Sequence, residues 1–131
     1  IWKQVGKYLL HSITHLSFKG YKEAIKPTMI KTYIKAYMGD DEVLYIYNRS
    51  SSPIKKGLVL SNGVGVVDSD FYNNLDNEGN IGVSFYNFFP FDVSIDKGDR
   101  ICQGVFAKFL KADNDIVLNN TRSGGYGSTG K

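Results

Sequence analysis

Short runs of alternating apolar and polar residues fill most of the chain after residue 24. The runs are rich in β-branched and aromatic residues, and turn-forming residues separate them. An alternation of period two places one face of a strand in a core and leaves the other face exposed. Many short strands divided by turns predict an all-β sandwich or barrel. The predicted strands are residues 25–27, 29–37, 43–47, 58–60, 81–85, 93–95 and 101–109.

Glycine and aspartate mark the expected breaks between these runs. Residues 39–41 (Gly-Asp-Asp) predict a hairpin turn, and residues 96–99 predict a second turn. Residues 73–79 form a polar excursion between two strands. Gly63 and Gly65 indicate tight backbone or the close approach of a ligand.

Residues 1–18 have a less regular pattern. Their apolar spacing is roughly helical, but capping residues are missing, and a pair of strands fits equally well. A helix would place His11 and His15 on one face, as a metal pair requires. The sequence offers no third ligand beside them, so two surface histidines are the alternative.

Composition narrows the class of protein. The 131 residues fit one domain spanning 1–131, and no apolar run is long enough to span a membrane. The single cysteine, Cys102, excludes an internal disulfide and favours a reducing compartment. With no signal peptide apparent, we expect a cytoplasmic protein. The net charge of +3 is mild and mixed, which suits a phosphate-bearing small ligand better than a nucleic acid or a membrane.

One stretch, residues 65–72, combines an apolar strand with acidic and aromatic residues. Asp68 stands where the strand ends, so its carboxylate can orient a water molecule. Phe71, three residues on, can cover a flat or sugar-like ligand. Ordinary turn chemistry is the alternative, because short polar side chains bond to their own backbone.

Three further stretches suit phosphate. Arg49 is followed by Ser50 and Ser51, which together offer a guanidinium fork and two hydroxyls. Gln103 follows the start of an apolar strand and either donates inward or lies at an edge. Residues 122–130 are rich in glycine, whose backbone N–H groups can reach phosphates, although a disordered terminus is the alternative.

The order and spacing of these stretches resemble motifs two to five of the trimeric dUTPases (deoxyuridine triphosphate nucleotidohydrolases). The resemblance covers residues 25–131. It implies a jelly-roll-like distorted β-barrel with a flexible glycine-rich arm at residues 119–131, and a homotrimer with shared sites. It also implies hydrolysis of dUTP to dUMP and pyrophosphate, with Mg²⁺ held mainly by substrate phosphates and water rather than by protein ligands. The matching stretches are 49–51 with 56–58, 62–71, 98–103 and 122–130.

The resemblance also implies roles for single residues. Asp68 would hold the deoxyribose 3′-hydroxyl and orient the attacking water. Asn62 and the backbone from Gly63 through Gly65 to Phe71 would read uracil. Phe71 stands where the family usually has a tyrosine under the sugar, so it keeps the ring and loses the phenol. The residues expected to contact phosphates or to close over the base are Arg49, Ser50, Ser51, Gln103, Arg122, Gly125, Tyr126, Gly127, Ser128 and Thr129.

Motif one departs from the family pattern. The family has Ala-Gly-Tyr-Asp there, whereas this chain has Lys-Gly-Tyr-Lys at residues 19–22. Lys22 takes the place of the acid that helps to hold the metal, and Glu23 follows. A missing loop, a rearrangement with Glu23 as substitute, or impaired metal handling would each explain it.

Two other functions compete with dUTP hydrolysis. The related deoxycytidine triphosphate deaminases need a glutamate on the strand after motif three, and residues 79–85 contain no acid. A catalytically weakened homologue that binds nucleotide and acts on a regulatory protein partner would fit the altered motif one.

Overall fold

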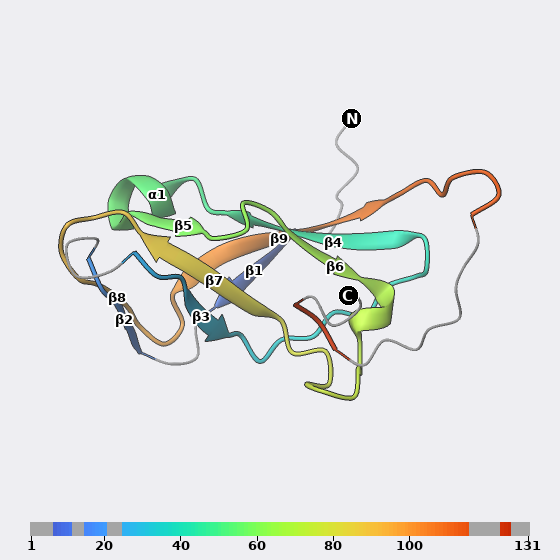
Figure 1. Ribbon diagram of the computed structural model, residues 1–131, viewed down its shortest axis with the longest axis horizontal. Helices are drawn as coiled ribbons and strands as arrows, with labels where there is room; N and C mark the ends of the chain where they lie inside the picture. Colours follow the sequence, from blue (N-terminus) through green and yellow to red (C-terminus); the bar gives the residue numbers. More distant parts are fainter. Residues whose placement is uncertain (1–6, 12–14, 21–24, 116–123, 127–131) are drawn as a thin grey trace.

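The structure is a computed structural model that describes residues 7–11, 15–20, 25–115 and 124–126. The prediction of an all-β fold is confirmed (Figure 1). The strands are β1 (Lys7–His11), β2 (Leu16–Phe18), β3 (Thr28–Lys31), β4 (Glu42–Asn48), β5 (Leu58–Leu60), β6 (Gly65–Asp68), β7 (Gly82–Asn87), β8 (Val93–Ile95) and β9 (Arg100–Lys108). One short helix, α1 (Ser51–Lys56), and one 3-10 turn, η1 (Ser69–Phe71), complete the described elements.

The described strands form three sheets in a jelly-roll-like arrangement. The largest sheet has the order β1-β9-β4-β6, a second has the order β3-β7-β5, and β2 pairs with β8 alone. All pairings are antiparallel. In the described part of the chain, the three sheets do not close into one continuous barrel.

The core lies between the two larger sheets, where alternate side chains of each strand meet. In β7, every second residue from Val83 onward is buried, as the period-two pattern requires. Phe85 meets Phe18 edge to face, with ring centroids 6.3 Å apart. The largest sheet contributes Leu44, Ile46, Ile101 and Cys102 to this core, and the smaller sheet contributes Ile30, Leu58, Leu60, Val83 and Phe85.

Three local predictions need correction. The helical alternative for residues 1–18 is wrong where the structure describes them, because β1 and β2 are strands that pair with β9 and β8. The turn at Gly39 exists, since Glu42 N donates to Gly39 O, but it joins strands of different sheets and closes no hairpin. The break after Asn48 contains the helix α1. Pro53 is compatible with this helix because it lies in the first turn, where a backbone N–H would have no partner within the helix.

Cys102 is fully buried on β9. Burial raises the pKa of its thiol to about 12, because the thiolate would lose its hydration. The thiol is therefore an inert part of the core rather than a nucleophile.

The described residues contain no helix long and apolar enough to cross a lipid bilayer.

Candidate active site

A pocket of about 450 Å³ opens beside the 3-10 turn η1 and is lined by residues of β6 and β7. Five of the residues expected at the site line it together. The pocket also takes in residues that the sequence did not single out, chiefly from β3, β5 and β7. The expected lining residues are Asn62, Gly65, Phe71, Gly125 and Tyr126, and the added ones include Met29, Ser61, Gly82 and Ser84.

Strand β7 continues past the end of its partner β5, and this offset supplies the pocket with main-chain groups. Ser84 O still accepts from Ser61 N at 2.9 Å. Chain direction then changes, because Gly63 N closes a turn onto Leu60 O at 3.1 Å. Gly82 lies two residues before Ser84, so its N–H and C=O face the same side. Those two groups therefore face the pocket and have no strand partner on that side within the described residues.

The sequence motifs did not include Gly82 among the expected site residues, because its position in the pocket wall depends on the register of β7 against β5. A glycine inside a predicted strand does, however, signal close approach of another group. A Cβ atom at this position would collide with Tyr126 Oη and lie 2.8 Å from Met29 Sδ. Glycine is thus the residue that leaves space at this wall of the pocket.

Phe71 forms the aromatic floor. It lies in η1 and is only 6% exposed. Asp68 precedes this turn at the end of β6, opposite Val43 across the strand pair, and its side chain is exposed. The structure therefore confirms the predicted strand end at Asp68, but Asp68 does not line the pocket itself.

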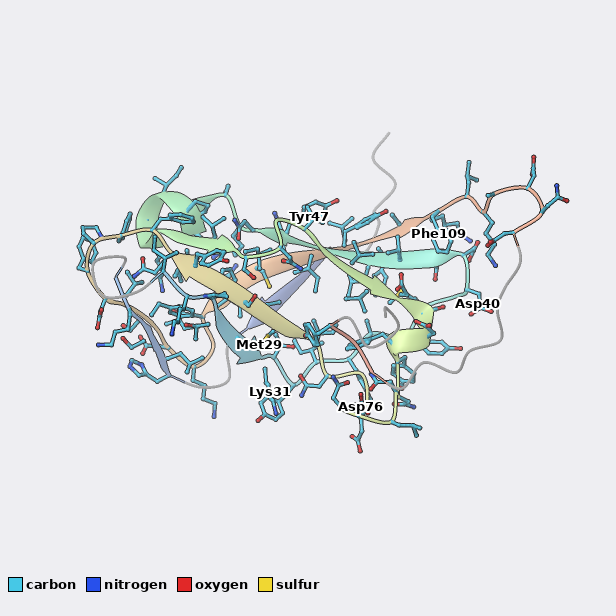
Figure 2. The ribbon with its side chains drawn as sticks, in the orientation of Figure 1. Met29, Lys31, Asp40, Tyr47, Asp76 and Phe109 are labelled. Atoms are coloured by element: carbon cyan, nitrogen blue, oxygen red, sulfur yellow. The ribbon has the colours of Figure 1, made fainter. Side chains whose placement is uncertain are left out.

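The loop of residues 73–79 is built around the buried side chain of Asn74. Asn74 Nδ2 donates to Phe71 O and to Asn77 Oδ1, both at 2.8 Å. Asn74 Oδ1 accepts from the backbone N–H groups of Asp76 and Asn77, both at 3.1 Å. Figure 2 shows Asp76 on this loop, near the described arm residues. The predicted polar excursion is thus an ordered loop attached to the pocket floor.

The described arm residues, 124–126, lie against the pocket. Gly124 is buried, and a Cβ atom there would collide with the Asp76 carboxylate. A Cβ atom on Gly125 would lie 2.6 Å from Phe71 Cε2. Tyr126 Oη accepts from Gly82 N at 2.8 Å and donates to Gly82 O at 2.9 Å.

A second, smaller cleft collects basic side chains at the other end of the molecule, around α1. Arg49 and Ser51 line it, together with Lys55, Lys56 and Arg100. The Arg49 guanidinium donates to Arg100 O at 3.0 Å. Lys56 Nζ lies 2.8 Å from Asp99 Oδ2. This concentration of positive charge suits phosphate.

The remaining expected site residues lie outside both cavities. Ser50 is exposed at the start of α1, where its side chain makes no cap hydrogen bond. Gln103 Nε2 donates to Asn48 O at 3.0 Å, so it stabilises the turn out of β4 in this chain. The predictions for Lys22, Glu23, Arg122, Gly127, Ser128 and Thr129 lie outside the described residues.

The metal-pair hypothesis for the two histidines loses its helical basis, since His11 is the last residue of β1 and His15 directly precedes β2. His15 Nδ1 instead lies 2.7 Å from Asp96 Oδ1. Among the described residues, no three histidine, cysteine, aspartate or glutamate side chains gather as a metal site.

The fold and the pocket define a jelly-roll-like β protein with an aromatic pocket floor and, in the pocket wall, main-chain groups of Gly82 that bond to a side chain rather than to a strand. The family model for dUTPase matches residues 14–130, so the chain belongs to the dUTPase family.

Individual relatives agree with this assignment. The chain is 55% identical over 103 residues to the deoxyuridine 5′-triphosphate nucleotidohydrolase of Lactococcus lactis, covering 78% of this chain and 69% of that protein. It is 35% identical over 114 residues to the enzyme of the same name from Haemophilus ducreyi, covering 83% and 71%.

Solved structures show the same fold. The dUTPase from Streptococcus mutans superposes with a TM-score of 0.77 at 41% identity, covering 85% of this chain and 84% of that one. A dUTPase from phage phi11 of S. aureus, in which a structural Mg(II) ion is coordinated, superposes with a TM-score of 0.68, covering 88% and 85%. At 17% identity, that second similarity concerns the fold alone.

Proposed function

We propose that the chain hydrolyses dUTP to dUMP and pyrophosphate, with uracil bound in the pocket beside Phe71. The observation that supports this proposal is the N–H and C=O pair that Gly82 presents to the pocket. The imide edge of uracil has a carbonyl oxygen next to an N–H, which complements this pair. Cytosine, held in the same orientation, offers donor and acceptor in the opposite order, so a mismatch would leave polar groups unsatisfied.

Asp68 is the residue proposed to orient the water that attacks the α-phosphate. Its exposed carboxylate directly precedes the turn η1, which carries Phe71, and follows Val67, which lines the pocket. The Phe71 ring is placed to pack against the sugar. The negatively charged triphosphate repels a nucleophile, so catalysis here consists mainly of positioning and charge neutralisation.

Mg²⁺ is the proposed cofactor, held mainly by phosphate oxygens and water. Mg²⁺ commonly keeps several waters and takes few protein ligands at phosphate sites. The ion would supply neutralisation of the phosphate charge.

A homotrimer with shared sites is the proposed assembly. Within one chain, the pocket and the basic cleft share no lining residue. Figure 1 shows α1 and η1 toward opposite ends of the molecule. A neighbouring chain that brings Arg49 and Ser51 to the pocket would supply the phosphate contacts. Residues 119–131, with Arg122, Gly127, Ser128 and Thr129, would close over the same site as an arm.

Hydrolysis is favoured over the two competing functions. The relatives at 41% and 55% identity are enzymes of dUTP hydrolysis by name, which disfavours the regulatory alternative. Strand β7 (Gly82–Asn87) carries no carboxylate, so the pocket wall lacks the acid that deamination requires.

Pyrophosphate release tests the proposal. We expect release from dUTP in the presence of Mg²⁺ and little release from dCTP, dTTP or UTP. Parallel reactions with EDTA test the metal. Equal release from dCTP and dUTP would contradict the assigned role of Gly82, and absence of release from every nucleotide would contradict the enzymatic function.

A further inference from the structure

Two serine hydroxyls lie side by side in the pocket wall, just beyond the end of β5. Ser61 N donates to Ser84 O at 2.9 Å, so the antiparallel pairing of β5 with β7 continues for one step past Leu60. The side-chain oxygens of the two serines share a hydrogen bond. Both residues line the pocket and are only partly buried, so a ligand in the pocket can reach them.

The alternation of β7 places Ser84 on the pocket side of its sheet. Val83 and Phe85 are buried in the core. Gly82 and Ser84 alternate with them and therefore lie on the opposite face of the strand. Met29 pairs with Ser84 across β3 and β7, and it also lines the pocket. The hydroxyl pair and Gly82 thus follow each other along one face of one sheet.

The hydroxyl pair has one O–H group left for a ligand. Each serine hydroxyl has one proton to donate and two lone pairs that accept. One of the two protons is used in the bond between Ser61 and Ser84, which is the only hydrogen bond of either hydroxyl within the described residues. Most other side chains that line the pocket are apolar. In such pockets a few polar groups fix the orientation of the ligand.

We propose that the hydroxyl pair of Ser61 and Ser84 is a further base-binding element, which donates one O–H to the uracil carbonyl oxygen that Gly82 does not bind. The imide N–H of uracil is flanked by two carbonyl oxygens, and Gly82 binds the N–H and one of them. The other oxygen loses its bond to water in a largely apolar pocket, so it needs a donor there. This inference rests on the proposed function in taking uracil as the ligand.

The hydroxyl pair contributes affinity for the base rather than selection against cytosine. A hydroxyl rotates, so it accepts from an amino group as well as it donates to a carbonyl oxygen. The main-chain groups of Gly82 have fixed roles as donor and acceptor. Discrimination between uracil and cytosine therefore stays with Gly82, and loss of the hydroxyls is expected to lower deoxyuridine affinity while the ratio of kcat/KM for dUTP to that for dCTP is kept.

The double variant Ser61→Ala with Ser84→Ala tests the contact, because either hydroxyl alone can donate to the base. We expect it to bind deoxyuridine about two- to tenfold more weakly than the unmodified chain. Titration calorimetry with the nucleoside avoids any contribution from phosphate contacts. Ser17→Ala with Ser94→Ala is the matched control. These two serines are exposed, face each other across β2 and β8, and line neither cavity, so their loss is expected to leave the affinity unchanged.

Bases with one oxygen replaced by sulfur give a second readout, which a merely structural role of the serines would not change. Sulfur accepts hydrogen bonds weakly, so 2-thiodeoxyuridine and 4-thiodeoxyuridine each weaken one carbonyl contact. Both analogues are expected to bind the unmodified chain less tightly than deoxyuridine does. In the double serine variant, the loss for one analogue should shrink, while the loss for the analogue whose sulfur faces Gly82 remains. Unchanged affinity for deoxyuridine, or unchanged losses for both analogues, would overturn the inference.

The two proposals fail in distinguishable ways. An unmodified chain that neither binds deoxyuridine nor releases pyrophosphate from dUTP would remove the proposed function. A chain that does both, but binds deoxyuridine equally well without the two hydroxyls, would remove only the hydroxyl contact.

Discussion

The side-chain amide of Asn74 donates to the carbonyl oxygen of Phe71 at 2.8 Å. This bond joins the loop of residues 73–79 to the aromatic floor of the pocket. Asn74 is 5% exposed, and its amide satisfies both the carbonyl of Phe71 and the side chain of Asn77. Its own oxygen accepts two backbone N–H groups of the loop.

Replacing Asn74 with alanine is expected to lower the free energy of unfolding by about 1–3 kcal/mol, since buried backbone groups lose their partner. Urea denaturation measures the change. Leu75→Ala, in the same loop but 84% exposed, is the control and is expected to be nearly neutral. Equal stability of the two variants would show that water replaces the Asn74 amide without cost.

Gly125 is expected to be intolerant of a side chain. In Gly125→Ala the new methyl group would lie 2.6 Å from Phe71 Cε2, and the buried ring has little room to move. Displacement of the arm or of the pocket floor should lower kcat/KM for dUTP by about 10- to 100-fold. Gly39→Ala, where the nearest atom is a mobile side-chain oxygen at 3.2 Å, is the comparison and should retain activity. Full activity of Gly125→Ala would mean that the arm is not seated on Phe71 during turnover.

Asp68→Asn removes the proposed water-orienting carboxylate at almost constant volume. We expect kcat for dUTP to fall by roughly 10²–10⁴-fold, the usual contribution of a general base. Deoxyuridine affinity should change little, because Asp68 does not line the base pocket. Asp70→Asn, two residues along in η1, is the matched control with kcat expected near that of the unmodified chain. A larger loss in Asp70→Asn than in Asp68→Asn would reassign the role.

The ion pair between Lys56 and Asp99 gives a pH-dependent prediction. The hydrogen bond from Lys56, with a second from Asp96 N, lowers the pKa of Asp99. A carboxyl whose pKa is lower in the folded chain stabilises the fold above its unfolded pKa, near 3.9. That stabilisation is lost as the pH falls through the folded pKa.

Urea unfolding of the unmodified chain and of Asp99→Asn from pH 7 to pH 2 tests the sign. The difference in unfolding free energy should be constant above about pH 5 and shrink below about pH 4. It should not exceed about 1 kcal/mol, because both side chains are more than a third exposed to screening solvent. A difference that grows on acidification would contradict the assignment.

Strand positions could be predicted from the alternation of residues because burial on one face of a sheet imposes that period. The run at residues 93–95 is β8 as predicted, and the runs at residues 43–47 and 101–109 differ from β4 and β9 by a residue at their ends. Residues 32–37 continue the alternation of β3, yet they form no strand. Alternation reports burial. Thr32 and Ile34 still share backbone hydrogen bonds with Ile81, but these bonds do not extend into a strand ladder.

The candidate site was only partly accessible to sequence reasoning. The motifs selected Asn62, Phe71 and Tyr126, and these three residues line one pocket. They did not reveal Gly82, because its main-chain groups reach the pocket only through the offset between β5 and β7. They grouped Arg49, expected to contact phosphate, with the base-binding residues as parts of one substrate site, whereas one chain keeps them in separate cavities.

Cys102 gives the protein a practical property. It is the sole thiol in the sequence and is fully buried, so a thiol-reactive dye reports only those molecules whose core has opened. The folded protein therefore offers such reagents no exposed thiol. A cysteine introduced in place of Leu110, which is 98% exposed, would therefore carry a label at a single defined position without removal of any natural residue from the core.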